Sequence, residues 1–186
     1  MIIREIEFTL KDGRKALIRS PKDEDIQGML DYLYISAGET EFILRYPEGK
    51  KEVTRIETEP WHFRYVGLPH SLIIEKTGLC FEEYIAFLKN FTPDGNVLFI
   101  NGSGRLFSVP FDGTASAGSG CAVYRVAASD EAVTRIPVPA GVDAPAVSGD
   151  NDGGFIVTVT FGAAPVRVTG VSDDVAAMID AIAPSN

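Results

Sequence analysis

The chain changes character at Thr92–Gly95, and this change constrains the fold more than any other feature. All of the lysines lie at or before Lys89, whereas two-thirds of the 18 glycines lie after residue 94. The segment itself, Thr-Pro-Asp-Gly, is a turn sequence. We therefore expect a boundary near residue 92, with a mixed αβ portion before it and a glycine-rich β portion after it.

The N-terminal portion contains both strand and helix patterns. Residues 3–10 alternate apolar and polar side chains, and Asp12–Gly13 then turns the chain toward residues 15–19, which predicts a β-hairpin. Ser20 and Pro21 are typical of a helix start, and the apolar stripe that follows them ends near Gly38. Further strands are predicted at 42–46 and 52–56, and helices at 68–76 and 81–91.

The C-terminal portion consists of short β-branched or aromatic runs separated by turn residues such as Asn101–Gly102. These runs lie at 97–100, 106–111, 122–127, 134–138, 155–161 and 166–169. Their spacing predicts a small antiparallel β domain. Ser172 is followed by two aspartates, a sequence typical of a helix N-terminus, so a C-terminal helix should close this domain. The expected fold class is α+β.

Composition excludes several classes of function. The formal charge of −9 argues against nucleic-acid binding, because phosphate contacts require a basic surface. No apolar run approaches the roughly 18 residues of a membrane span. The charged N-terminus, Met1–Glu5, does not fit a signal peptide, so we expect a cytoplasmic protein. Cys80 and Cys121 form no C-x-x-C pattern, which favours free thiols over a disulfide.

The tetrad Glu59-Pro60-Trp61-His62 points to hydrolytic chemistry, because it places a carboxylate and an imidazole three residues apart. In a metallohydrolase a neutral imidazole holds zinc, and a carboxylate takes a proton from the attacking water. The tetrad therefore makes His62 a candidate zinc ligand and Glu59 a candidate general base.

The stretch from about residue 42 to 161 resembles the C-terminal part of zinc D-alanyl-D-alanine carboxypeptidases of the VanY type. The resemblance rests on Arg45-Tyr46-Pro47 with Gly49-Lys50, on the nine residues Glu59–Gly67 with His70, on Phe81–Tyr84, and more weakly on Val147–Val157. It implies that Glu59 is the catalytic base, that His62 is the last zinc ligand, and that the substrate is a peptide ending in D-Ala-D-Ala.

The chain departs from this family upstream of the tetrad. The family's other two ligands, a His and an Asp, come from a segment of the form S-x-H-x-x-G-x-A-x-D. Nothing before Glu59 fits that form. The chain has two histidines, His62 and His70, and both come after Glu59. The resemblance therefore implies an incomplete zinc site, with two of three ligands missing.

The first 48 residues resemble the opening of a GNAT-type N-acetyltransferase, in Leu10–Arg14, Ile18–Pro21 and Ala37–Glu48. That fold needs a Q/R-x-x-G-x-G/A loop to hold the pyrophosphate of acetyl-CoA at a helix N-terminus, and the loop is absent. Both resemblances include residues 42–48, which suggests a chimeric chain. Its segments would be 1–48, acetyltransferase-like; 49–92, carboxypeptidase-like; and 93–186, a β-rich extension with a C-terminal helix.

Each candidate site residue also has a structural interpretation. His62 could be left over from a dismantled site, packed beside Trp61 and hydrogen-bonded to backbone, because a lone imidazole cannot hold zinc tightly. Glu59 could be a solvated or ion-paired acid. Arg64 could bind a peptide carboxylate through its bidentate fork. Trp61 could contact substrate, but a core anchor is favoured. His70 is expected to cap a helix or lie on the surface.

The leading hypothesis is a relic or fragment of a zinc-dependent D-alanyl-D-alanine carboxypeptidase for peptidoglycan peptides, inactive alone because its zinc site is incomplete. One alternative is a non-catalytic peptide or protein interaction module, and another is a degenerate acetyltransferase. Zinc binding would favour the carboxypeptidase, and acetyl-CoA binding would favour the acetyltransferase. A protein that binds neither would favour the interaction module.

Overall fold

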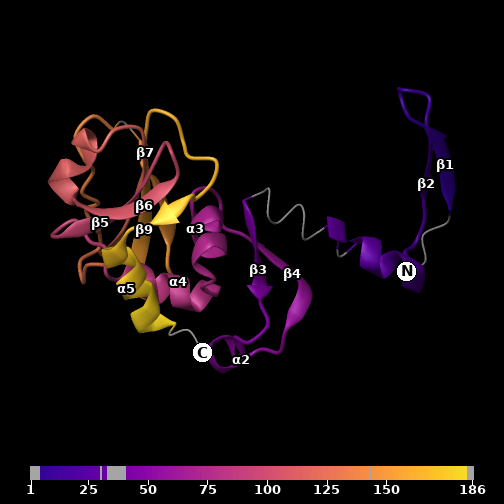
Figure 1. Cartoon of the computed structure of the whole chain (residues 1–186), viewed down its shortest axis with the longest axis horizontal. Helices are drawn as coiled ribbons and strands as arrows, with labels where there is room; N and C mark the ends of the chain where they lie inside the picture. The colour runs from indigo at the N-terminus through magenta and orange to yellow at the C-terminus, as the bar shows by residue number, and fades with distance from the viewer. Residues whose placement is uncertain (1–4, 30, 33–40, 143, 184–186) are drawn as a thin grey trace. The chain divides into compact units, whose positions relative to one another are not determined.

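The computed structural model describes residues 5–29, 31–32, 41–142 and 144–183 (Figure 1). The chain divides into two compact units, Met1–Ser36 and Ala37–Asn186. Within the described residues, no helix is both long enough and apolar enough to cross a membrane.

The first unit begins with the predicted hairpin. Strands β1 (Ile6–Thr9) and β2 (Lys15–Ile18) pair antiparallel. The short helix η1 (Asp23–Asp25) follows, and residues 26–29 and 31–32 are also helical. Helix geometry starts at Asp23 rather than at Pro21, because the Asp25 carboxylate accepts a hydrogen bond from the Lys22 N–H at 2.8 Å. The predicted end of this helix, with Leu30, Leu33 and Gly38, lies outside the described residues.

The second unit opens with a two-stranded sheet of β3 (Phe42–Tyr46) and β4 (Glu59–Tyr65), in which Phe42 lies opposite Tyr65. The connection contains one helical turn, α2 (Lys51–Thr54), which ends at Arg55 in the left-handed region at φ 62°. The prediction of a strand at 52–56 is therefore wrong. The hydrogen-bonding partner of β3 is β4, so the β-branched residues of the connection have no strand to pair with.

Two helices follow, and both were predicted. Helix α3 (His70–Thr77) ends at Gly78 in the left-handed region, and α4 (Phe81–Leu88) begins after Cys80. The Glu83 carboxylate accepts a hydrogen bond from the Cys80 N–H at 2.7 Å and pairs with Lys50 at 2.8 Å. The start of α4 is thereby joined to the loop after β3.

The main sheet has six strands in the order β10-β6-β5-β7-β9-β8, with antiparallel neighbours except for the parallel pair β10–β6. Its strands are β5 (Asn96–Asn101), β6 (Arg105–Pro110), β7 (Gly120–Ala127), β8 (Ala146–Gly149), β9 (Gly154–Phe161) and β10 (Gly170–Val171). Helix η2 (Phe111–Ser116) follows β6, and the predicted C-terminal helix is α5 (Asp173–Ile182). The mixture of helices and strands agrees with the α+β class.

Two predicted strands are not formed. Residues 134–138 run outside the sheet, because Pro137 has no N–H for a ladder and its carbonyl accepts a hydrogen bond from the Tyr124 hydroxyl at 2.6 Å. Residues 166–169 also lie outside, and the strand β10 begins one residue later, at Gly170. The Thr169 N–H donates to the Gly104 carbonyl at 2.7 Å, which brings the chain to the edge of β6.

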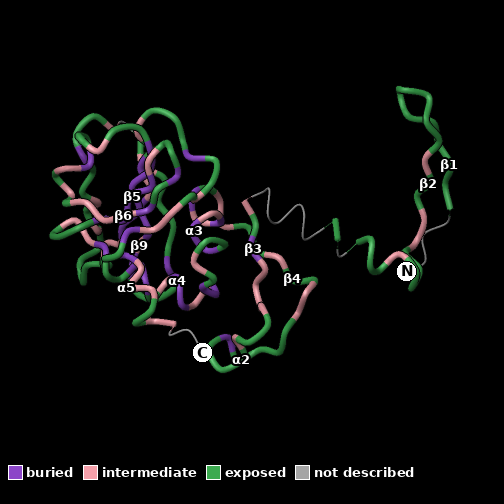
Figure 2. Tube along the Cα trace, in the orientation of Figure 1, coloured by how far each residue is buried: buried purple, intermediate pink, exposed green. Residues whose placement is uncertain are grey.

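A single buried cluster joins the sheet to the helices (Figure 2). It contains Phe87 from α4, Phe91 from the loop just after α4, Phe99 from β5 and Val175 from α5. This core therefore extends across the predicted boundary at residue 92. Cys80 and Cys121 are buried free thiols, as predicted. The proposed three-segment division of the chain stays a prediction.

Candidate functional site

Strand β4 brings the carboxylate of Glu59 and the imidazole of His62 into contact. The Glu59 Oε2 atom lies 2.9 Å from His62 Nδ1. Residues three apart on a regular strand face opposite sides of the sheet, so this contact needs an irregularity. The pairing register shows such an irregularity. Leu44 pairs with Phe63 and Tyr46 pairs with Glu59, so an advance of two residues along β3 matches an advance of four residues along β4.

This contact fixes the role of each ring nitrogen of His62. A carboxylate accepts hydrogen bonds, so Nδ1 carries the hydrogen, and a neutral ring presents its lone pair at Nε2. The ring also packs edge-on against Tyr46, with centroids 4.8 Å apart. The arrangement resembles that of metal-binding histidines, whose second nitrogen donates to a carboxylate. The structural interpretation of His62 expected a hydrogen bond to backbone and packing beside Trp61, but the hydrogen bond is to Glu59 and the ring packs on Tyr46.

In the part of the chain that the structure describes, no further zinc ligands gather around this pair. Over the described ranges, no group of three or more His, Cys, Asp or Glu side chains could hold a metal ion. A structural zinc site needs four ligands and a catalytic one needs three. The described residues thus contribute one imidazole and one acid, which do not fit a complete zinc site.

Trp61 lies on the surface, and its prediction as a core anchor is wrong. The residue is 63% exposed, and Val53 and Ile56 of the β3–β4 connection are exposed as well. The buried core of this unit comes mainly from α3, α4, α5 and the main sheet, with Ile43 from β3, and Trp61 is not part of it. Its indole therefore remains available to a ligand or a partner.

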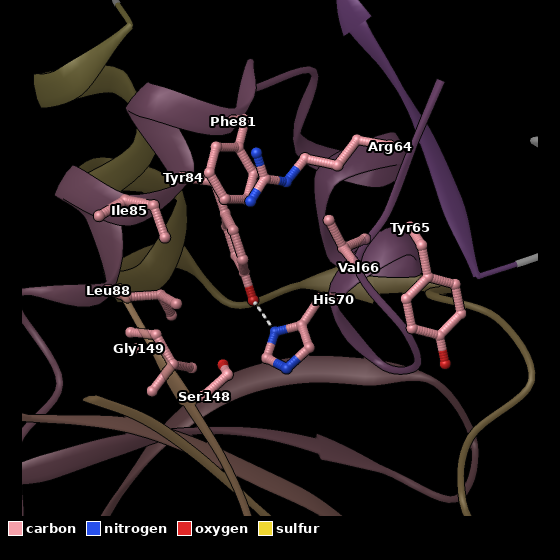
Figure 3. Close-up of a pocket in the computed structure, with 11 residues that line it drawn as sticks. Arg64, Tyr65, Val66, His70, Phe81, Tyr84, Ile85, Leu88, Ser148 and Gly149 are labelled. Atoms are coloured by element: carbon pink, nitrogen blue, oxygen red, sulfur yellow. Dashed lines mark hydrogen bonds between the residues drawn. The ribbon is translucent and has the colours of Figure 1, made fainter. Parts of the chain in front are cut away.

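Arg64 lies two residues after His62 and lines a cavity of about 240 Å³ (Figure 3). Its guanidinium stacks on the Phe81 ring at 4.3 Å. Figure 3 shows Arg64 extending over Phe81 while the Tyr65 ring points away, as strand alternation predicts. The cavity is walled by Arg64, Tyr65, Val66, His70, Phe81, Tyr84, Ile85, Leu88, Ser148, Gly149 and Ile156.

His70 joins three elements at the floor of this cavity. Its Nδ1 lies 2.8 Å from the Tyr84 hydroxyl on α4, and its Nε2 lies 2.9 Å from Thr158 Oγ1 on β9. Burial lowers the pKa of His70 to about 4 and raises the pKa of Tyr84. Both groups are therefore uncharged at neutral pH. The expected position at a helix start is confirmed, but the expected capping or surface role is wrong.

Several cavity residues were not predicted as a site. Tyr84, Ser148 and Ile156 lie far along the chain from β4, and nothing in the local sequence indicates that they meet it. The signals available were the family resemblance, which includes Phe81–Tyr84 and Val147–Val157, and the hydroxyl of Tyr84 within an otherwise apolar helix face.

Comparisons with known proteins find similarity in the segment that contains β4. Residues 20–68 match the family model "VanY: D-alanyl-D-alanine carboxypeptidase". A D-alanyl-D-alanine carboxypeptidase of Enterococcus faecium is 60% identical over 48 residues, which cover 26% of this chain and 16% of that protein. The bifunctional D-Ala-D-Ala dipeptidase and carboxypeptidase VanXYC of Enterococcus gallinarum is 62% identical over 47 residues, 25% of each protein.

A solved structure extends the likeness beyond this segment. The vancomycin resistance D,D-dipeptidase VanXYg, in complex with a D-Ala-D-Ala phosphinate analogue, aligns with a TM-score of 0.58 and 32% identity. The alignment covers 79% of this chain and 55% of that one. The chain therefore matches a quarter or less of each of these two curated relatives and about half of the solved one.

The family match begins at residue 20, inside the segment that resembles acetyltransferases. The acetyltransferase-like N-terminus and the chimeric origin remain predictions. The matched segment contains the Glu59–His62 pair, and the aligned structure includes most of the fold around it. By sequence and by structure, the chain is related to the VanY-type and VanX-type D-Ala-D-Ala peptidases.

Proposed function

We propose that β4 carries one half of a D-Ala-D-Ala peptidase site, the half that consists of the base and one ligand. The observation that supports this is the 2.9 Å contact between Glu59 and His62 within the segment that matches the VanY model. Glu59 would accept a proton from the attacking water, and His62 would bind the metal through Nε2. Zinc, where a full set of ligands holds it, activates that water and polarises the scissile carbonyl.

The substrate of a completed site would be a peptide that ends in D-Ala-D-Ala. This follows from the names of the related enzymes and from the analogue bound to VanXYg. Trp61 lies between the two residues on β4 and is exposed, so we expect it nearest such a peptide. We infer that the chain does not hydrolyse it unaided, because one imidazole does not retain zinc.

The test is the zinc affinity of the purified full chain, beside His62→Ala and, as a matched control, His70→Gln. We expect zinc binding weaker than micromolar and no D-alanine release from a D-Ala-D-Ala peptide. Stoichiometric, micromolar zinc that is lost in His62→Ala but kept in His70→Gln would overturn the inference of inactivity. It would also mean that ligands beyond those the described residues bring together in one chain complete the site.

The role of the pair itself needs a separate measurement. A complementing fragment with the family's missing His and Asp ligands should restore D-alanine release to the full chain, and Glu59→Gln should abolish that restored activity. Restoration that is indifferent to Glu59 would show that the proposed base is wrong.

A further inference from the structure

A groove follows the edge strand β8, formed by two adjoining cavities. The first is the cavity beneath Arg64, and the second, of about 300 Å³, runs past Ala146, Val147 and Ser148 of the strand. The two share Tyr65, Val66, His70, Ser148 and Ile156. The groove therefore runs from α4 along β8.

Among the residues that the structure describes, no strand pairs with the outer edge of β8 along this groove. Strand β8 is the last strand of the main sheet, and its four residues are exposed. The Asp150 N–H donates to the Gly154 carbonyl just beyond it. Because bonded and non-bonded pairs alternate in an antiparallel ladder, the N–H and C=O groups of Val147 and Gly149 point away from β9. An extended peptide can pair with such an edge.

One end of the groove carries the cationic side chain of Arg64, and the acid Glu41 lines the second cavity. Across the described residues, no carboxylate lies within ion-pair distance of Arg64, whereas Arg45 beside the same Phe81 ring is bound by Glu82 at 2.8 Å. Stacking on Phe81 holds the Arg64 guanidinium over the cavity mouth. No other side chain with a formal charge lines the first cavity at neutral pH.

The remainder of the first cavity is apolar and small. Phe81, Ile85 and Leu88 supply one wall, and Val66 and Ile156 another. A cavity of about 240 Å³ is below the ~300–1,000 Å³ that drug-sized ligands occupy. It suits one apolar side chain at the end of a longer ligand whose chain continues along β8.

We propose that this groove binds the C-terminal residues of an extended peptide. The terminal carboxylate pairs with Arg64, the last side chain, which is apolar, enters the cavity beside Phe81 and Ile85, and the backbone pairs with β8. Glu59 and His62 do not line either cavity, so the proposal does not rest on the peptidase half-site.

The test uses the full chain in EDTA and a fluorescein-labelled hexapeptide with a C-terminal leucine, followed by fluorescence polarisation. The same peptide with a C-terminal amide is the first control. A charge-assisted hydrogen bond contributes about 1.5–3 kcal/mol, so the amide should bind roughly 10- to 100-fold more weakly. Equal binding of acid and amide would overturn the role of the carboxylate.

Variants locate the site. Arg64→Gln should weaken the acid peptide at least about tenfold and leave the amide unchanged, while Arg135→Gln, an exposed arginine outside the groove, should have no effect. Ile85→Glu, which places an anion in the cavity, should abolish binding, with circular dichroism to show that it folds. Arg64→Gln binding like the unchanged chain would refute the assignment.

Two further outcomes bear on the peptide backbone. Methylation of the amide nitrogens of the two residues before the leucine should weaken binding, because β8 then loses hydrogen bonds. If 4-methylpentanoate alone binds as tightly as the peptide, the cavity takes small acids and the peptide proposal falls. Absence of saturable binding up to about 1 mM peptide also refutes it. Glu59→Gln should leave binding unchanged, which separates this result from the peptidase test.

Discussion

Among single residues, Asp150 closes the turn between β8 and β9 with a carboxylate that has no exposed surface. It accepts hydrogen bonds from the N–H groups of Asp152 and Gly154 at 2.7 and 2.8 Å, and from Arg125 Nε at 2.7 Å. Burial alone would raise the pKa of Asp150, but these donors outweigh it and hold the pKa below 3.8. The Asp150 carboxylate therefore holds the backbone of this turn in place.

We expect Asp150→Ala to destabilise the protein by about 3 kcal/mol, because it leaves Arg125 and two N–H groups without their acceptor. Urea unfolding measures this change. The exposed Asp130→Ala should stay within about 0.5 kcal/mol. The Asp150 contribution is complete above pH 3.8 and is lost as the pH falls through its lowered native pKa. An Asp150→Ala protein as stable as Asp130→Ala would contradict this account.

His70 gives the protein a second dependence on pH. Its pKa is about 4 in the folded chain and 6.5 ordinarily, so the unfolded state binds the proton more tightly. Folding stability should therefore fall as the pH drops from 6.5 to about 4. His70→Gln, which removes the titrating group, should flatten the stability profile between those values. The measurement is the urea midpoint at half-unit steps of pH; parallel profiles for the two proteins would refute it.

Among the elements, the N-terminus of α4 depends on Glu83. This buried acid caps the Cys80 N–H and binds Lys50, and its pKa is lowered by Lys50 and by the N–H and side chain of Cys80, against the effect of burial. We expect Glu83→Ala to cost about 2 kcal/mol, as removing a helix cap and one partner of a part-buried ion pair does. The exposed Glu75→Ala on α3 is the control, and thermal unfolding of both variants is the measurement.

The sequence predicted a helix or strand boundary correctly where turn and capping residues determine it. The hairpin at Asp12–Gly13, the α3 end at Gly78 and the α5 start at Ser172 all follow from turn and cap residues. The sequence predicted strands wrongly where strand formation depends on a partner strand. Residues 52–56 have strand composition, yet β3 pairs with β4 instead, and at 134–138 Pro137 cannot serve a ladder.

The site shows the same division. The Glu59 and His62 pair is visible as a motif, but their contact depends on a register irregularity that no local pattern signals. The groove could not be predicted, because Arg64, Tyr84 and Ser148 belong to three elements, β4, α4 and β8, that are far apart along the chain. Side chains that are far apart along the chain are brought together by strand order, which periodicity does not encode.

For the whole molecule, the two units differ in what stabilises them. The buried cluster lies entirely within residues 43–175, whereas Ile6, Phe8, Leu17 and Ile26 of the first unit are all exposed. An isolated two-stranded hairpin is at best marginally stable. We expect residues 37–186 alone to unfold cooperatively with nearly the urea midpoint of the full chain, and peptide 1–36 to show no transition. Loss of folding in 37–186 would contradict this.

The two buried thiols make the core of this chain chemically observable. Burial raises the pKa of Cys80 to about 11 and also raises that of Cys121, so neither is a reactive thiolate in the folded state. Cys80 lies at the start of α4, and Cys121 lies in β7. A disulfide reagent should therefore modify each cysteine only when its element opens. Identifying the modified cysteine by mass spectrometry would report the opening of α4 and the opening of the main sheet separately. The two native cysteines serve as the probes, so none has to be introduced.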